Sequence, residues 1–153
     1  MARSRPEPGF VVRREAWWVR HEKWWSGFER FGSGDIDGAI ECLAPDCISI
    51  TPSGALNNAR HHAAAQALKD ALPDSHMELT RVLESGDEIC VTGRFKGTHH
   101  HELATPLGMV APSGKTLDLM FVDYFRVRDG KIIECEAVRD RLDMILQLGG
   151  VPR

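Results

Sequence analysis

The stretch KTLDLMFVDYFRVRDGKIIECEAV, from Lys115 to Val138, has the pattern of two long strands joined by a tight turn. Side chains of a strand alternate between its two faces. The first half, Lys115–Arg128, shows this alternation over its whole length. Asp129-Gly130 is a dipeptide typical of hairpin turns, and Lys131–Val138 returns as the partner strand. We therefore predict a long antiparallel hairpin.

One face of the first strand is apolar except at a single acidic residue, Asp123. The other residues predicted on that face are Leu117, Leu119, Phe121, Phe125 and Val127. A buried carboxylate needs a partner, or its pKa rises so that it stays neutral. A carboxyl group of raised pKa in an apolar pocket suits acid/base chemistry near neutral pH. Asp123 is therefore the first catalytic candidate. The alternative is a structural aspartate bonded to a tryptophan N–H or a backbone amide.

The register of the hairpin decides which residue faces Asp123. A two-residue turn would pair Asp123 with Glu136, whereas a three-residue loop with a bulge at Gly130 would pair it with Cys135. The odd positions of the returning strand are apolar or small, so the hydrophobic pattern favours Cys135. The other register would make Asp123 and Glu136 a carboxylate pair.

Helical patterns come before the strands along the chain. We predict helices over 11–31, after Asp35, and from Asn57 or Asn58 to about Ala71, with Pro45-Asp46 ending the second. The remaining predictions are strands over 47–51, 77–84 and 88–99, a loop over 100–114, and a short helix that holds Leu142, Ile145 and Leu148. Helices followed by an antiparallel meander indicate an α+β fold. We predict one domain over 11–149, after a disordered lead-in over 1–10.

The bulk properties exclude several classes of protein. The net charge is −3 and the pI about 6.1, which gives no electrostatic reason to expect a nucleic acid or an anionic membrane as partner. No apolar run approaches the roughly 20 residues of a membrane span, and the N-terminus lacks the apolar core of a signal peptide. The four cysteines form no CxxC pair. We expect reduced thiols and a cytoplasmic protein.

Several short motifs, in order, resemble a known family. Gly34-Asp35-Ile36-Asp37 through Leu43-Ala44-Pro45-Asp46 resembles the helix-to-strand signature of the nuclear-transport-factor-2-like superfamily. Four further segments resemble the SnoaL-like polyketide cyclase branch of this superfamily. They are Gly97-Thr98-His99, Pro112-Ser113-Gly114-Lys115, 122–132 and Leu146-Gln147-Leu148-Gly149. The resemblance implies a cone-shaped α+β barrel, a curved antiparallel sheet wrapped around N-terminal helices that encloses an apolar pocket. It also implies a cofactor-free enzyme and a homodimer formed through the outer face of the sheet.

The resemblance carries over to this chain only in part. The protonated aspartate of ketosteroid isomerase falls on Asp123, and a pocket histidine of the SnoaL cyclases falls on the same position. The catalytic aspartate of the SnoaL cyclases falls on Ala137. The general base of the isomerase falls on Thr51, and its oxyanion tyrosine falls at or near Gly27. We therefore expect a retained pocket with a rearranged acid/base set.

Two histidines are expected to help Asp123 in proton transfer. His21 lies on the inward face of the first predicted helix, and His99 matches the family's strand-end motif; a structural role is the alternative for both. We expect no metal site, because adjacent histidines at 99–101 point in different directions. The predicted substrate-binding residues are Trp24, Phe28, Thr51, Phe95, Phe121, Cys135 and Arg139. For the aromatic residues plain core packing is the alternative.

Three functions remain open from the sequence. The first is a cofactor-free cyclase or isomerase acting on an apolar, polyketide-like substrate of specialised metabolism. The second is an epoxide hydrolase or an epoxide-opening, ether-ring-forming cyclase, in which neutral Asp123 would protonate the epoxide oxygen. The third is a non-catalytic protein that binds lipophilic ligands, and the alanine at position 137 is its best support.

Overall fold

The computed structural model describes residues 22–150, with side chains from residue 25 onward. The helices are α1 (Glu22–Ser33), α2 (Ile36–Ile40), α3 (Asn58–Ala71) and α4 (Arg141–Leu148). The strands are β1 (Leu43–Thr51), β2 (Gly54–Leu56), β3 (His76–Ser85), β4 (Glu88–Thr98), β5 (Leu103–Thr105), β6 (Gly108–Val110), β7 (Thr116–Arg128) and β8 (Lys131–Arg139). The predicted lead-in and most of the first predicted helix lie outside the described residues.

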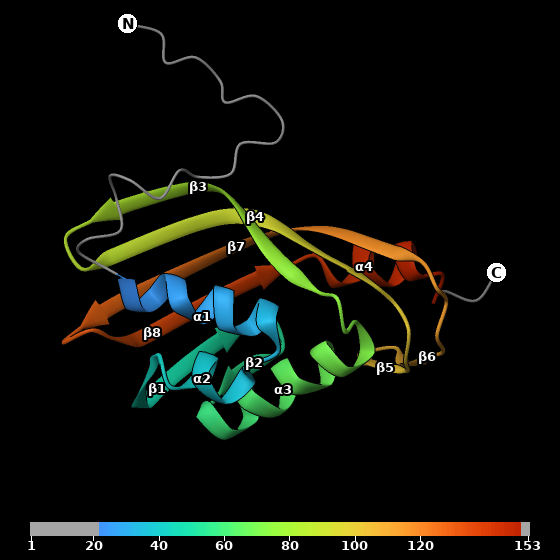
Figure 1. Ribbon diagram of the computed structural model, residues 1–153, viewed down its shortest axis with the longest axis horizontal. Coiled ribbons are helices and arrows are strands. Elements are labelled where there is room, and N and C mark those ends of the chain that lie inside the picture. The colour runs from blue at the N-terminus through green and yellow to red at the C-terminus, as the bar shows by residue number, and fades with distance from the viewer. Residues whose placement is uncertain (1–21, 151–153) are drawn as a thin grey trace, which may run out of the picture.

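Six of the strands form one curved sheet in the order β2-β1-β8-β7-β4-β3, and β5 and β6 form a separate small hairpin. Helices α1, α2 and α3 lie against one face of the large sheet (Figure 1). We call this covered face the inner face. The buried side chains of β4 and β7 alternate with more exposed ones, so their odd-numbered residues form the core on the inner face. The α+β class is confirmed.

Three sequence predictions about the strands are wrong in detail. The sheet is mixed, because β1 pairs in parallel with β8. β1 begins at Leu43, so Pro45-Asp46 lies inside a strand and does not end a helix. The predicted loop over 100–114 contains the β5–β6 hairpin. Pairing between distant segments, which local periodicity does not record, explains the first two differences.

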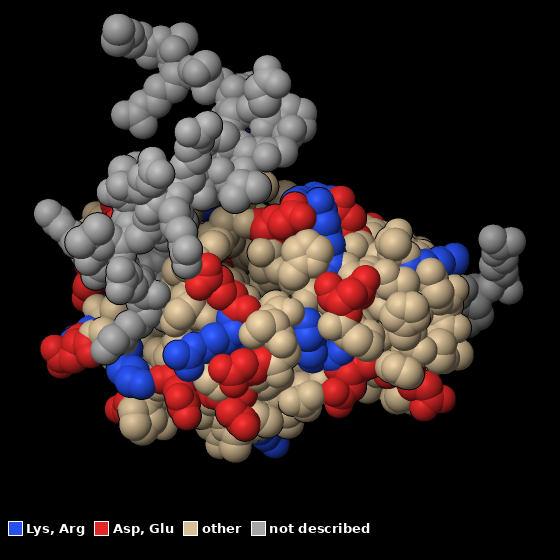
Figure 2. Space-filling view, viewed as in Figure 1, with Lys and Arg blue, Asp and Glu red and all other residues tan. Residues whose placement is uncertain are grey.

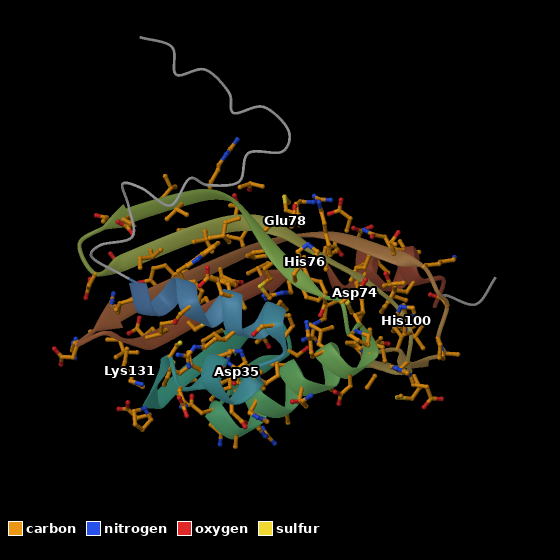
Figure 3. The ribbon with its side chains drawn as sticks, in the orientation of Figure 1. Asp35, Asp74, His76, Glu78, His100 and Lys131 are labelled. Atoms are coloured by element: carbon orange, nitrogen blue, oxygen red, sulfur yellow. The ribbon has the colours of Figure 1, made fainter. Side chains whose placement is uncertain are left out.

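Two predicted helix starts are confirmed by their caps. Asp35, at the start of α2 in Figure 3, accepts a hydrogen bond from the backbone N–H of Gly38 at 2.9 Å. Asn57 caps α3 in the same way through the N–H of Arg60. Each side chain satisfies a backbone donor that has no partner within its own helix. These caps fix where the two helices begin relative to β1.

The β7–β8 hairpin has a register that neither sequence alternative predicted. Asp129 and Gly130 both have positive φ, 51° and 71°, as a two-residue hairpin turn requires. One extra residue then enters β8, because Val127 pairs with Ile132 but Arg126 pairs with Glu134. This bulge shifts the register by one, so Asp123 faces Ala137, not Cys135 or Glu136. The predicted inward direction of Asp123 is nevertheless correct.

Gly93 in β4 lets an aromatic ring of β7 cross the strand. A Cβ at this position would overlap the backbone oxygen of Glu78 and lie 2.7 Å from Cζ of Phe121. Phe121 pairs with Gly93 in the ladder and is 1% exposed. The missing side chain therefore makes room for the Phe121 ring.

We expect Gly93→Ala to lower the free energy of unfolding by about 3 kcal/mol, because backbone and a buried ring must both move. Urea denaturation measures this change. Gly32→Ala is the matched control, since a Cβ there would meet only Cβ of His76 at 3.7 Å and would favour the helix. Equal urea midpoints for Gly93→Ala and Gly32→Ala would contradict the explanation that Gly93 makes room for the Phe121 ring.

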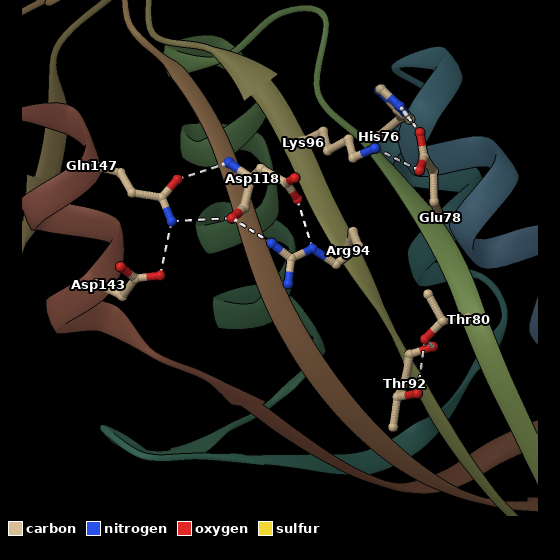
Figure 4. Close-up of polar contacts among 9 residues, drawn as sticks. All are labelled: His76, Glu78, Thr80, Thr92, Arg94, Lys96, Asp118, Asp143 and Gln147. Carbon is tan, nitrogen blue, oxygen red and sulfur yellow. Dashed lines mark hydrogen bonds and ion pairs between the residues drawn. The ribbon is translucent and has the colours of Figure 1, made fainter. Parts of the chain in front are cut away.

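A side-chain amide completes the sheet where β8 has ended. The last β8 residue paired to β7 is Arg139, opposite Phe121. Beyond it, Gln147 of α4 accepts a hydrogen bond from the backbone N–H of Asp118 and donates one to its carbonyl oxygen, at 2.9 and 3.0 Å (Figure 4). The carboxylate of Asp118 also accepts from Arg94 at 2.7 Å. Gln147 thus takes the place of a strand backbone and holds α4 on β7.

Candidate functional site

Asp123 forms a buried ion pair on the inner face of the sheet. Its two carboxylate oxygens each accept a hydrogen bond from one terminal nitrogen of Arg139, both at 3.3 Å. Asp123 is 3% exposed, whereas the side chain of Arg139 is 24% exposed. The predicted lone carboxylate therefore has a partner, supplied by the neighbouring strand. Asp123 is buried, and Arg139 is the more exposed member of the pair.

Burial and charge act in opposite directions on Asp123. Removal from water raises the pKa of its carboxyl group above the usual range, and the Arg139 guanidinium opposes this effect. Burial is the larger cause, so the pKa is raised. A carboxylate of raised pKa is a stronger base than an exposed aspartate and can hold a proton closer to neutral pH.

A group of aromatic rings adjoins this ion pair through Phe121. The guanidinium carbon of Arg139 lies 5.4 Å from the ring centroid of Phe121. Phe28 of α1 lies 6.1 Å from Phe121 and 5.8 Å from Phe125, centroid to centroid. Phe28 is only partly buried, so it is the ring of this group that a ligand can reach most readily. The arrangement is an apolar wall with one charged pair.

A second buried polar pair lies on the same side of the sheet. Oγ of Ser49, in β1, is 2.8 Å from Nδ1 of His61, in α3. Ser49 is 2% exposed and pairs with Cys135 of β8 in the ladder. Burial, and to a smaller extent the charge of Arg139, lower the pKa of His61, so its ring is neutral near pH 7. The influence of Arg139 on His61 places the two polar pairs in one environment.

Sequence reasoning did not select Ser49 or His61 as site residues. His61 shares one face of its helix with Ala65, Leu68 and Leu72 by spacing, and a histidine on an apolar face needs a partner. For Ser49 the sequence pattern is misleading, because it alternates with Ile48 and Ile50, which an apolar pattern places inward but which are exposed in the structure. The contact between Ser49 and His61 depends on how α3 crosses β1.

His99 lies far from Asp123. Val91 is the β4 partner of Asp123, and His99 follows eight residues later, about 25 Å along the strand. His99 is fully buried, and its Nδ1 accepts a hydrogen bond from the backbone N–H of Ser113 at 3.3 Å. The structure does not bring His99 and Asp123 together, so direct help in proton transfer is excluded by distance.

The other predicted site residues have varied positions. Thr51 uses its hydroxyl within the β1–β2 turn, donating to the carbonyl oxygen of Gly54 at 2.9 Å. Phe95 is 1% exposed and packs against Phe31, with ring centroids 6.1 Å apart. His21 lies outside the described residues, and so does the side chain of Trp24. The inner face thus brings together Asp123 and Arg139 with the other predicted residues Phe28, Phe121 and Cys135.

Cys135 has a buried thiol that stays in its neutral form near pH 7. It is 4% exposed, and burial raises its pKa to about 12. Cys47 is 1% exposed with a raised pKa, and Cys42 is also buried, whereas Cys90 is partly exposed. Because the thiolate is the reactive form, burial protects three of the four thiols.

We expect iodoacetamide at pH 7.5 to label the native protein once, at Cys90. Mass spectrometry of a peptide digest locates the adduct, and urea-unfolded protein, in which all four thiols react, is the control. Rapid labelling of Cys135 in the native state would show that the site is open to water.

The described residues contain no group of three or more histidine, cysteine or acidic side chains that could hold a metal ion. Within the same part of the chain, no helix is long and apolar enough to cross a membrane. Acidic and basic side chains are interspersed over the face shown in Figure 2.

The fold agrees with a known class of domain. A model of the SnoaL-like domain matches residues 26–135, most of the described chain. The protein therefore belongs to the SnoaL-like domain family. No curated protein matches the sequence.

Solved structures share the same architecture. AclR from Streptomyces galilaeus, provisionally described as a hydroxylase, has a TM-score of 0.76 and 21% identity, covering 86% of this chain and 96% of its own. IdmH from Streptomyces antibioticus, provisionally described as a polyketide cyclase, has a TM-score of 0.71 and 24% identity, with 84% and 96% covered. A SnoaL-like protein from Jannaschia sp. CCS1 has a TM-score of 0.70 and 24% identity, with 88% and 96% covered. At these identities the likeness shows the fold alone.

Proposed function

We propose that the protein is a cofactor-free cyclase or isomerase that removes a proton from the carbon beside a carbonyl group of an apolar, polyketide-like substrate. The carboxylate of Asp123 accepts this proton, and the electron pair of the C–H bond moves to form an enolate. In a cyclisation the enolate carbon attacks a second carbonyl of the same substrate. In an isomerisation Asp123 returns the proton to a different carbon.

The observation that carries this proposal is the buried pair of Asp123 and Arg139. A guanidinium bound to both carboxylate oxygens favours the ionised form, which a base must have to accept a proton. Burial raises the pKa of Asp123, and a carboxylate of higher pKa binds a proton more strongly and is therefore a stronger base. The aromatic wall of Phe28, Phe121 and Phe125 suits the apolar ring of such a substrate.

The position of Ala137 supports a rearranged acid/base set. The SnoaL cyclases that this chain resembles have their catalytic aspartate at this position of the strand. Here Ala137 is the direct ladder partner of Asp123. Directly paired residues have Cβ atoms about 5 Å apart, so a carboxylate from β7 reaches nearly the same place as one from β8. An acid on the neighbouring strand serves the same part of the inner face, and this supports a catalytic protein over a non-catalytic one.

Deuterium exchange tests this function without the natural substrate. 2-Tetralone in deuterated buffer gains deuterium at its α-carbon when a base removes the proton, and mass spectrometry follows the gain. We expect the protein to accelerate this exchange above the buffer rate and to leave indene oxide unhydrated. Hydration of indene oxide without exchange would favour the epoxide-opening alternative. Binding of 2-tetralone with neither reaction would favour a ligand-binding protein.

The proposal retains a cytoplasmic homodimer. All four cysteines are free thiols, which suits a reducing compartment. The outer faces of β1, β7 and β8 expose the apolar side chains Ile48, Ile50, Met120 and Val138. An exposed apolar patch of this kind suits an interface between two copies.

A further inference from the structure

We infer that His61 is a second catalytic residue, which donates a hydrogen bond from Nε2 to the substrate oxygen that becomes negative, and that Ser49 is the positioning residue that holds it in this form. The inference rests on the proposed function, since it assigns the group that receives the charge generated when Asp123 removes the proton. It concerns residues that neither the sequence motifs nor the family resemblance selected.

The hydrogen bond between Ser49 and His61 decides which ring nitrogen carries the proton. A hydroxyl group can donate one hydrogen bond, and an imidazole nitrogen is a far better acceptor than a thiol sulfur. We therefore assign Ser49 as the donor to Nδ1 of His61, 2.8 Å away, in preference to the sulfur of neighbouring Cys135. Since a neutral imidazole has one N–H, the proton of His61 is then on Nε2.

Ser49 can hold this orientation because its surroundings are rigid. It is 2% exposed, in a β1 strand paired with β8. The thiol of Cys135 beside it is neutral, with a pKa of about 12, so no negative charge is present there to attract a proton to Nδ1. The neutral state of His61 follows from burial and from the charge of Arg139.

The Nε2–H group is free to bind a ligand. Within residues 25–150, Nε2 of His61 has no hydrogen-bond partner, and the ring is only partly buried. Arg139 directs one N–H of each terminal nitrogen to Asp123. His61 supplies a separate N–H donor, from α3, on the same side of the sheet. A donor prepared in advance for a developing oxyanion lowers the barrier to proton removal.

The geometry allows one substrate to contact both groups. Ser49 and Asp123 lie on β1 and β7, which are separated by β8 alone. With Ser49 opposite Cys135 and Asp123 opposite Ala137, their Cα atoms are about 12 Å apart. Nδ1 of His61 lies at one end of this interval, against Ser49, and Asp123 lies at the other. A ketone seated between them can present its α-hydrogen to one group and its oxygen to the other.

Binding of 2-naphthol, which resembles the enol of 2-tetralone, tests His61 without requiring turnover. We expect His61→Ala to weaken binding about 10-fold. His61→Gln keeps an N–H donor near the place of Nε2 and should bind within about 3-fold of the wild type. His62→Ala, which removes an exposed histidine paired with Asp37, is the matched control. Unchanged binding in His61→Ala would overturn the role, as would equal losses in His61→Ala and His61→Gln.

Nitrogen NMR of the labelled His61 ring tests the positioning role of Ser49 directly. We expect the wild-type spectrum to show a protonated Nε2 and an unprotonated Nδ1, and Ser49→Ala to give a mixture of the two neutral forms. A protonated Nδ1 in the wild type would overturn the inference. This result is independent of Asp123: loss of deuterium exchange in Asp123→Asn would still support the proposed function. No binding of 2-naphthol to the wild type would count against both.

Discussion

Asp123→Asn is expected to slow the exchange of the α-hydrogens of 2-tetralone by about 10²–10⁴-fold, the usual contribution of a positioned general base. Asparagine keeps the shape of the side chain and cannot accept the proton. Arg139 is 24% exposed and can turn its freed guanidinium toward water, so we expect the fold to survive. Circular dichroism and urea denaturation of the variant check that point.

Asp118→Asn is the matched control for this substitution. Asp118 is in the same strand, but its side chain is on the outer face and bound to Arg94. The chemical change is identical, and only the face differs. If Asp123→Asn catalysed deuterium exchange at the wild-type rate, Asp123 would have no role in the reaction.

Arg139→Met is expected to slow the exchange by about 10²-fold and to move its dependence on pH. Asp123 acts only when ionised, so activity is lost as the pH falls through the pKa of Asp123. Arg139 lowers that pKa against the effect of burial. Its removal therefore raises the pKa further, and the acid limb of the pH–rate profile moves to higher pH.

The control for Arg139→Met is Arg126→Met. Arg126 is near the end of β7 on the outer face, where it binds Glu88 and Glu134. Arg126→Met removes the same charge from a residue that does not contact Asp123. A shift of the acid limb to lower pH in Arg139→Met, or the same shift in both variants, would contradict the role assigned to the ion pair.

The sequence was informative wherever a pattern is local. The period-two alternation of Lys115–Arg128 was enough to place Asp123 on the buried face. The caps Asp35 and Asn57 were identified because a capping side chain acts within three residues of its own position. The α+β order followed in the same way from successive local patterns.

The sequence was least informative where contacts depend on register. The partner of Asp123 is set by one extra residue in β8 near Ile133, and nothing in the alternation of the two strands predicts on which side a bulge falls. The sequence predicts Arg139 as a substrate-binding residue but not as the partner of Asp123. The contact between Ser49 and His61 joins a strand to a helix that begins nine residues later, so only the packed fold reveals it.

The pH dependence of deuterium exchange into 2-tetralone, catalysed by the wild-type protein, tests the central claim most directly. If ionised Asp123 removes the proton, the rate rises with pH to a plateau, and its midpoint lies above the pKa of an exposed aspartate, because burial raises the pKa of Asp123. A rate that falls as the pH rises through that region would mean that the neutral acid is the active form. That result would contradict the account.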